Sequence, residues 1–174
     1  MQYDQFKKKL RLPDGTEAPT QLVYGELEAQ AITRDHLDDD VAGINASLDL
    51  IRKTRGGPWP TGPVTSEGNF VDLVWHECEF RDGGSYTYAV YHADHGYIGC
   101  CYLYPLGGRT TLTAELARDH DVDVSWWVTP PRVPARRLHH SLRRPTALAR
   151  RPVPALAALL LQPRASPDRS SRLS

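Results

Sequence analysis

The chain of 174 residues is long enough for one domain with a hydrophobic core and too short for two independent domains of ordinary size. Its 21 basic and 21 acidic residues balance, so the total charge favours neither a nucleic-acid partner nor a charged membrane surface. The two ends differ, however. Residues 1–130 carry 11 Lys and Arg against 20 Asp and Glu, whereas residues 131–174 carry 10 Arg and a single acid, Asp168. That second part has seven of the 14 prolines and no aromatic residue, a composition that packs a core poorly.

The cysteines and the apolar runs indicate a compartment. Cys78, Cys100 and Cys101 are odd in number and two are adjacent, which favours reduced thiols over a disulfide framework. The basic residues near the N-terminus precede no apolar run, so we expect neither a secretory signal nor a transit peptide. The longest apolar stretch, Ala155–Leu161, is far shorter than the roughly 18–20 residues that span a bilayer. We expect a soluble, cytoplasmic protein without a membrane partner.

The first elements in chain order are a polar lead-in, a strand and a helix. Residues 1–20 contain turn formers and predict an extended or loosely ordered segment without chemistry. Alternation over Glu26–Ile32 predicts a half-exposed strand. A helix then begins at Thr33 or Asp35 and continues to about Lys53, with one apolar stripe at three- and four-residue spacing. The acids Asp38, Asp39 and Asp40 in its first turn favour the positive end of the helix dipole, so we interpret them as a solvated helix start.

A second helix and three strands follow. Thr65 or Ser66 can cap a helix that ends before Gly83 and Gly84. This helix contains Phe70, Leu73, Val74, Glu77 and Phe80, and its apolar positions define one face. Two runs rich in Tyr, Val and Ile flank a polar turn at residues 93–96 and predict a hairpin of central strands. After a connector with a short helix at residues 113–118, a last strand spans residues 121–128. Its two faces carry Val122, Val124, Trp126 and Val128 on one side and Asp121, Asp123, Ser125 and Trp127 on the other.

The predicted order is a strand, two helices and three strands, and it includes the runs IGCCYLYPL and VDVSWWVTP. Over residues 22–130, this order resembles the first half of the GNAT-type N-acetyltransferases. In that family the strand that matches Val122–Val128 splays from its neighbour, and its backbone binds the pantetheine arm of acetyl-CoA. The resemblance implies that Trp127, Val128 and Thr129 bind acetyl-CoA through main-chain hydrogen bonds, as peptides augment sheets. The alternative is an ordinary buried strand whose tryptophans fill the core.

The resemblance also implies roles for two side chains. Catalysis requires a base that takes a proton from the attacking amine, either a carboxylate or an ordered water. Asp123 is the candidate on the strand beside the acetyl site, with Asp121 second, although the alternation of Asp123 with apolar residues fits a solvated strand face better than a base. Trp59 lies where the family shapes the acceptor pocket, or it plugs the core. Ser125 lacks the surroundings of a nucleophile elbow, so covalent catalysis is not expected.

The last part of the chain departs from the family. The motif Q/R-x-x-G-x-G/A, whose amides cradle the pyrophosphate, should follow Pro130, yet no glycine occurs in residues 131–174. The tyrosine that often serves as general acid is missing too. Arg132, Arg136 and Arg137 can attract phosphates only as charges. A shift of reading frame near Pro130 explains all these changes together and predicts a truncated remnant or a small binding module as the alternative to an active enzyme.

The sequence also contains residues that could bind a metal ion or a nucleic acid. Thiolate and imidazole are preferred zinc ligands, but no C-x-x-C pair occurs, and Cys100 and Cys101 point to opposite faces of one strand, so no metal is expected. The arginines of residues 131–174 come without an aromatic or base-reading motif, so no specific nucleic acid is expected either.

The sequence therefore predicts an α+β, GNAT-like fold with a mixed, mostly antiparallel sheet, flanking helices and an incomplete C-terminal part. Residues 1–20 are a lead-in, residues 21–130 an acetyltransferase-like domain, and residues 131–174 an irregular, Arg- and Pro-rich tail. The expected reaction transfers acetyl from acetyl-CoA directly to an amine of a small molecule or a peptide. The sequence leaves the acceptor and the oligomeric state open.

Overall fold

The structure is a computed structural model that describes residues 9–10, 12, 16–54, 59–107, 113–119 and 122–129. The predicted tail at residues 131–174, the composition change at Pro130 and the second candidate base, Asp121, lie outside the described residues.

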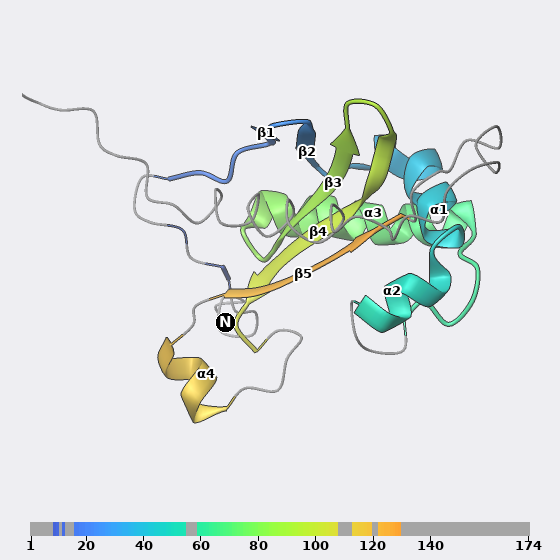
Figure 1. The fold of residues 1–174 in the computed structure, drawn as a ribbon. Coiled ribbons are helices and arrows are strands. Elements are labelled where there is room, and N and C mark those ends of the chain that lie inside the picture. Colours follow the sequence, from blue (N-terminus) through green and yellow to red (C-terminus); the bar gives the residue numbers. More distant parts are fainter. Residues whose placement is uncertain are drawn as a thin grey trace, which may run out of the picture.

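One sheet organises the described part of the chain. Its strands follow the order β1-β2-β3-β4-β5, and all four pairings are antiparallel (Figure 1). The bounds are β1 Gln21–Tyr24, β2 Leu27–Ala31, β3 Tyr86–His92, β4 Gly96–Pro105 and β5 Val122–Val128. The predicted α+β class is confirmed, with β3 and β4 in the interior of the sheet. No parallel pair occurs among the described strands.

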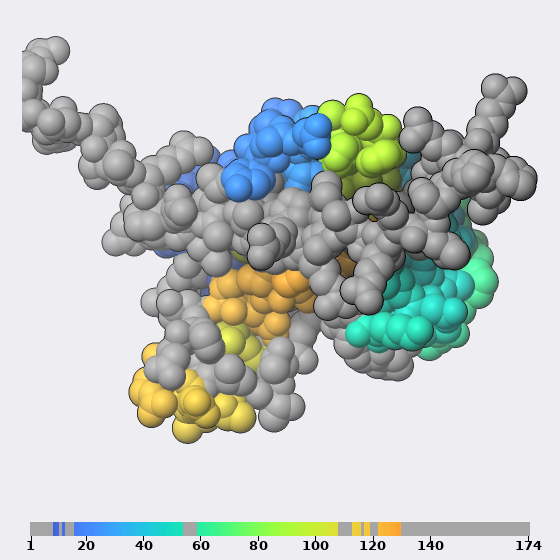
Figure 2. Space-filling model, viewed as in Figure 1, coloured from blue at the N-terminus to red at the C-terminus, as the bar shows by residue number. Residues whose placement is uncertain are grey.

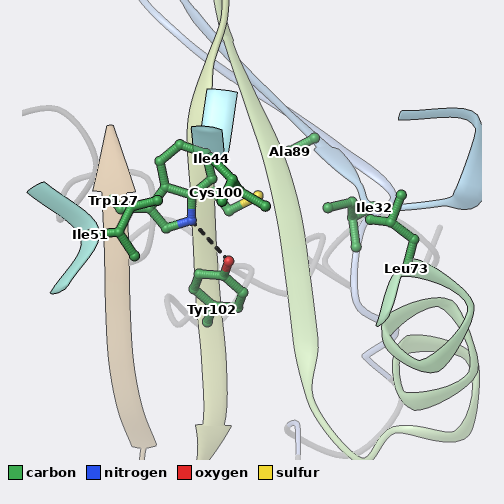
Figure 3. Close-up of a cluster of buried hydrophobic side chains, with 8 residues drawn as sticks. All are labelled: Ile32, Ile44, Ile51, Leu73, Ala89, Cys100, Tyr102 and Trp127. Carbon is green, nitrogen blue, oxygen red and sulfur yellow. Dashed lines mark hydrogen bonds between the residues drawn. The ribbon is translucent and has the colours of Figure 1, made fainter. Parts of the chain in front are cut away.

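Three helices cover one face of this sheet. They are α1 Leu37–Asn45, α2 Leu48–Thr54 and α3 Ser66–Asp82, and each contributes an apolar side chain to a core that we call the helix-side core. Its buried members are Ile32, Ile44, Ile51, Leu73, Ala89, Cys100, Tyr102 and Trp127 (Figure 3). Burying side chains of this size provides most of the stabilisation that holds helices against a sheet.

The opposite face packs against residues of the lead-in. This lead-in-side core contains Leu10, Ala29, Tyr86, Tyr88, Val90, Cys101 and Leu103. Leu10 is only 7% exposed, and its amide donates to the Gly83 carbonyl at 3.1 Å. The Tyr88 hydroxyl donates to the Pro19 carbonyl at 3.0 Å. These hydrogen bonds and the burial of Leu10 hold the described residues of the lead-in against this face of the sheet.

The first predicted helix is divided. A 3-10 turn, Arg34–His36, begins after Thr33, whose hydroxyl accepts from the Asp35 amide as a cap. The chain then forms α1 and α2 with a break at Ala46 and Ser47. Ile44 before the break and Ile51 after it both lie in the helix-side core. Sequence reasoning also missed β1, which pairs with β2 as a short hairpin.

The later elements match their predictions closely. Thr65 caps α3 by accepting from the Gly68 amide, and Gly83 ends the helix in the left-handed conformation. The helix α4, Ala114–Asp119, lies in the predicted connector. No helix in the described ranges is long and apolar enough to cross a membrane.

Candidate functional site

The residues expected to bind acetyl-CoA lie at the C-terminal end of β5, and they differ in exposure. Trp127 is 1% exposed and lies in the helix-side core, where its indole N–H donates to the Tyr102 hydroxyl at 2.9 Å (Figure 3). Val128 and Thr129 are half-buried. The alternation predicted from sequence is confirmed, since Trp127 faces the helices while Trp126 and Val128 pack against the lead-in-side core.

The backbone of β5 presents two different edges. On one side it pairs with β4 from Gly99 to Pro105, and the Thr129 amide donates to the Ile98 carbonyl at 2.6 Å. Because hydrogen-bonding directions alternate along an antiparallel strand, the N–H and C=O of Val128 point away from β4. No described strand pairs with this outer edge of β5.

An irregularity in β4 shapes the same end of the site. Between the pairs Val90–Gly99 and Tyr91–Tyr97 the register shifts by one residue, so Ile98 is a bulge. Gly99 has φ of +146°, and a Cβ there would lie 2.1 Å from the Trp127 carbonyl oxygen. Only glycine therefore lets β4 approach β5 at this point. The extra residue also places Tyr97 and Cys100 on one face of the sheet, although their spacing would put them on opposite faces of a regular strand.

A buried polar cluster lies behind this bulge. Asp40 of α1 is 3% exposed, and its carboxylate accepts from the Asn69 amide at 2.8 Å and from the Tyr97 hydroxyl at 2.5 Å. The Cys100 thiol contacts the same carboxylate at 3.5 Å and the Tyr97 oxygen at 3.1 Å. We call Asp40, Asn69, Tyr97 and Cys100 the Asp40 cluster. This cluster joins α1, α3 and β4. At this junction, hydrogen bonds to the buried Asp40 carboxylate take the place of apolar packing.

The interpretation of Asp40 as part of a solvated helix start was wrong. Its neighbours Asp38 and Asp39 are exposed as expected, and Asp39 accepts from the Tyr91 hydroxyl at 3.1 Å. Asp40, in contrast, lies one helical turn before Ile44, on the side of α1 that faces the sheet. That i, i+4 relation to a core residue was a readable signal for a buried carboxylate.

The same cluster meets the acetyl-CoA candidates through aromatic packing. The Tyr97 and Trp127 rings lie 6.1 Å apart at 64°, an edge-to-face arrangement. Both rings contact Gly43 of α1, where an added Cβ would lie 2.7 Å from Tyr97 and 3.2 Å from Trp127. The position of Trp127, and hence of the end of β5, depends on how closely α1 approaches the sheet.

Burial makes the thiol and the hydroxyl of the Asp40 cluster unreactive. Desolvation raises the pKa of the Cys100 thiol and of the Tyr97 hydroxyl well above their ordinary values. On the other face of β4, burial raises the pKa of Cys101 to about 12. Protonated thiols are poor nucleophiles, so these cysteines are structural.

This difference in environment predicts the reactivity of the thiols. With Ellman's reagent near neutral pH, we expect only half-buried Cys78 of the three cysteines to react in the folded protein. All three should react after unfolding in guanidinium. Peptide mapping that finds Cys100 or Cys101 labelled in the folded protein would contradict the buried environment described here.

The remaining predicted residues lie elsewhere. Asp123 is half-buried and pairs with Tyr104, five residues before Val128 and so about 16 Å from it along the strand. Trp59 is half-buried and packs against the helix-side core, as expected of a plug. The Ser125 hydroxyl is buried and has no hydrogen-bond partner within the described part of the chain. The structure thus brings Trp127, Val128 and Thr129 together and leaves Asp123 at the other end of β5.

Two surface grooves lie apart from these residues. One, of about 490 Å³, follows α2 and the turn before it. The other, of about 750 Å³, lies between the lead-in and the second half of α3, with Phe80 and Tyr86 in its wall. Neither groove is lined by a predicted site residue.

The part of β5 at the molecular surface is visible in Figure 2 (orange), beside the end of β4. Within the described residues, no three His, Cys, Asp or Glu side chains come together as a metal site requires.

The chain was compared with protein-family models, with curated proteins and with solved structures, and none of the three comparisons gives a match.

Proposed function

We propose that this chain is a GNAT-type N-acetyltransferase that transfers acetyl from acetyl-CoA to an amine of a small molecule or a peptide. The observation that carries the proposal is the position of β5. It is the last strand of an antiparallel sheet whose helices α1 to α3 lie on one face, and its outer edge has no described partner strand. The resemblance implies that the backbone groups of this strand bind the pantetheine arm, and the position of β5 supports this role.

The outer edge of β5 would bind the pantetheine arm through main-chain hydrogen bonds. The pantetheine arm is an extended chain with two amides, and it can add to a strand edge as another strand would. Val128 offers an outward N–H and C=O for this purpose, while Thr129 is held by its bond to Ile98. Among the described strands, none pairs with this donor and acceptor, and they lie next to a residue that is fixed in the sheet.

The position of the acetyl group determines which base is used. If the carbonyl lies beside Val128, Asp123 is too far away, and an ordered water must take the proton from the amine. If it lies near the middle of β5, Asp123 comes within reach of a water-mediated transfer. In both cases the amine attacks the thioester directly, and the thiolate of CoA leaves. The proposal includes a cytoplasmic location, which the three free thiols favour.

Two proline substitutions test the edge. Val128→Pro removes the outward N–H without removing a bond to β4, so acetyl-CoA binding measured by calorimetry should weaken at least about tenfold. Val124→Pro removes an equivalent outward N–H at a distance from the proposed contact and should leave the affinity within about twofold. Equal losses in both variants, at equal thermal stability, would show that the contact is elsewhere.

A specific observation favours the alternative of a truncated remnant. The glycine-rich turn expected after Pro130 is absent from the sequence, so the pyrophosphate lacks its usual amide cradle. The same calorimetric titration decides between the two readings. Micromolar binding of acetyl-CoA by the wild-type chain supports the enzyme, whereas the absence of heat up to about millimolar ligand would overturn it.

A further inference from the structure

The orientation of α3 is unusual for a helix that covers a sheet. The side facing the core carries the buried polar residues Asn69, His76 and Glu79, with Leu73 as the buried apolar residue. The side facing away carries a continuous apolar stripe at helical spacing, which we call the outer stripe: Phe70, Val71, Val74, Trp75 and Cys78. Phe70, Val71 and Trp75 are 41%, 66% and 59% exposed. Our sequence prediction placed Phe70 on one apolar face with Leu73, whereas the structure buries Leu73 and exposes Phe70.

Hydrogen bonds explain why α3 does not rotate to bury the outer stripe. The Asn69 amide donates to Asp40 at 2.8 Å, His76 Nδ1 lies 3.1 Å from the Thr87 hydroxyl, and Glu79 accepts from Ser85 at 2.7 Å. A rotation that hid the stripe would take these side chains away from Asp40, Thr87 and Ser85, which would stay buried without them, at a cost of about 1–3 kcal/mol for each lost partner. The exposure of the stripe is therefore a stable property of the fold.

We propose that the outer stripe is an interface between two copies of this chain, with the two α3 helices packed antiparallel about a two-fold axis near Val74. Contiguous exposed apolar surface of this kind marks interaction sites. Figure 1 shows α3 behind the strands of the sheet. It packs over β3, whereas the proposed acetyl-CoA edge belongs to β5, the last strand in the order, so such a dimer leaves that edge accessible. This interface does not depend on the proposed reaction.

Charge placement favours a second copy as the occupant. Glu67 and Arg81 are exposed at opposite ends of the stripe, 14 residues apart and within about 40° of each other around the helix. In the antiparallel arrangement Glu67 of each helix lies opposite Arg81 of the partner subunit, so the symmetry creates two complementary contacts. Arg81 also pairs with Asp82 on its own helix at 3.0 Å, yet its side chain is 71% exposed and able to contact a second carboxylate. The antiparallel helix dipoles add a small favourable contribution.

The size of the stripe sets the expected affinity. A helix of 17 residues is about 25 Å long, so a pair of such helices buries less than a standard interface. We therefore expect a dissociation constant on the order of micromolar. A symmetric pair is self-complementary and closes, so it produces a dimer and no larger assembly.

Matched valine substitutions test the interface by sedimentation equilibrium between about 1 µM and about 1 mM of the full chain. Val71→Glu places a charge in the outer stripe and should weaken dimerisation at least about tenfold. Val23→Glu makes the same change on β1 at nearly the same exposure, 67% against 66%, and should leave the dissociation constant unchanged. A monomeric wild type at every concentration, or a dimer that only Val23→Glu disrupts, would overturn the proposal.

A charge exchange tests the antiparallel register. Glu67→Arg and Arg81→Glu alone should each weaken the dimer, because like charges then face each other across the axis. The double variant restores both opposite pairs and should recover most of the wild-type affinity. Additive losses in the double variant would exclude this register, and circular dichroism of each variant verifies that the helix content is unchanged.

Discussion

Replacing Gly99 by alanine is expected to lower the free energy of unfolding by about 3–5 kcal/mol, from backbone strain and overpacking together. The new Cβ would lie 2.1 Å from the Trp127 carbonyl oxygen and 3.0 Å from the Val128 Cα, and these are backbone atoms that cannot turn aside. The strand β5 must move away from β4, or the bulge must rearrange. Urea denaturation followed by tryptophan fluorescence measures the loss, because Trp126 and Trp127 lie on β5.

Gly96 supplies the matched control for this prediction. It also has positive φ, +67°, but nothing lies within 4 Å of an added Cβ. Gly96→Ala should therefore cost only the conformational strain, about 1–2 kcal/mol. If both variants lose the same stability, the contact between Gly99 and Trp127 does not determine how β5 is held. Acetyl-CoA binding, where present, should be affected by Gly99→Ala much more than by Gly96→Ala.

Most of the secondary structure follows from local signals. Alternation predicts β5 and the faces of Trp126 and Trp127, because a strand of period two leaves little freedom once one face is apolar. The turn after β3 and the caps Thr65 and Gly83 are likewise visible in the sequence, since each is a local requirement of the backbone. Short connections account for the hairpins β1–β2 and β3–β4, whereas β2 reaches β3 only through α1 to α3 and β4 reaches β5 only through the segment that contains α4.

The orientation of α3 could not be read from the sequence, because a hydrophobic stripe does not reveal which side is inward. Phe70 and Val74 form a plausible core face only if the polar side has no better partners. Those partners, Asp40, Thr87 and Ser85, come from three other segments that become neighbours only in the fold. The bulge at Ile98 is a second such case, since IGCCYLYP alternates equally well with or without it.

One part of the candidate site, the end of β5, follows from local sequence signals, and the other part, the Asp40 cluster, does not. The end of β5 could be placed because the sequence marks it with Thr129 and Pro130, and the binding of acetyl-CoA by Trp127, Val128 and Thr129 stays a prediction. The Asp40 cluster was missed because a run of three acids at a helix start has a sufficient local explanation. Its buried member is distinguished only by its relation to Ile44, which requires knowing which side of α1 faces the sheet.

Replacing Asp40 by alanine is expected to cost about 3–5 kcal/mol of the free energy of unfolding, since the Tyr97 hydroxyl and the Asn69 amide both lose their charged acceptor in a buried site. Asp39→Ala is the control on the same helical turn. Asp39 is exposed and also accepts from a tyrosine, Tyr91, so its removal should cost less than about 1 kcal/mol. Equal effects at the two positions would contradict the burial of Asp40.

A double-mutant cycle separates the hydrogen bond from the packing. Tyr97→Phe keeps the ring that contacts Trp127 and removes only the hydroxyl, which should cost about 1–3 kcal/mol because the Asp40 carboxylate then loses a donor. Asp40→Ala combined with Tyr97→Phe removes both partners, so the double variant should lose at least about 0.5 kcal/mol less than the sum of the single losses. Strict additivity would mean that Asp40 and Tyr97 stabilise the chain independently. A coupling in stability together with faster hydrogen exchange at the Thr129 amide would show that the contact between α1 and Tyr97 holds the end of β5 in place.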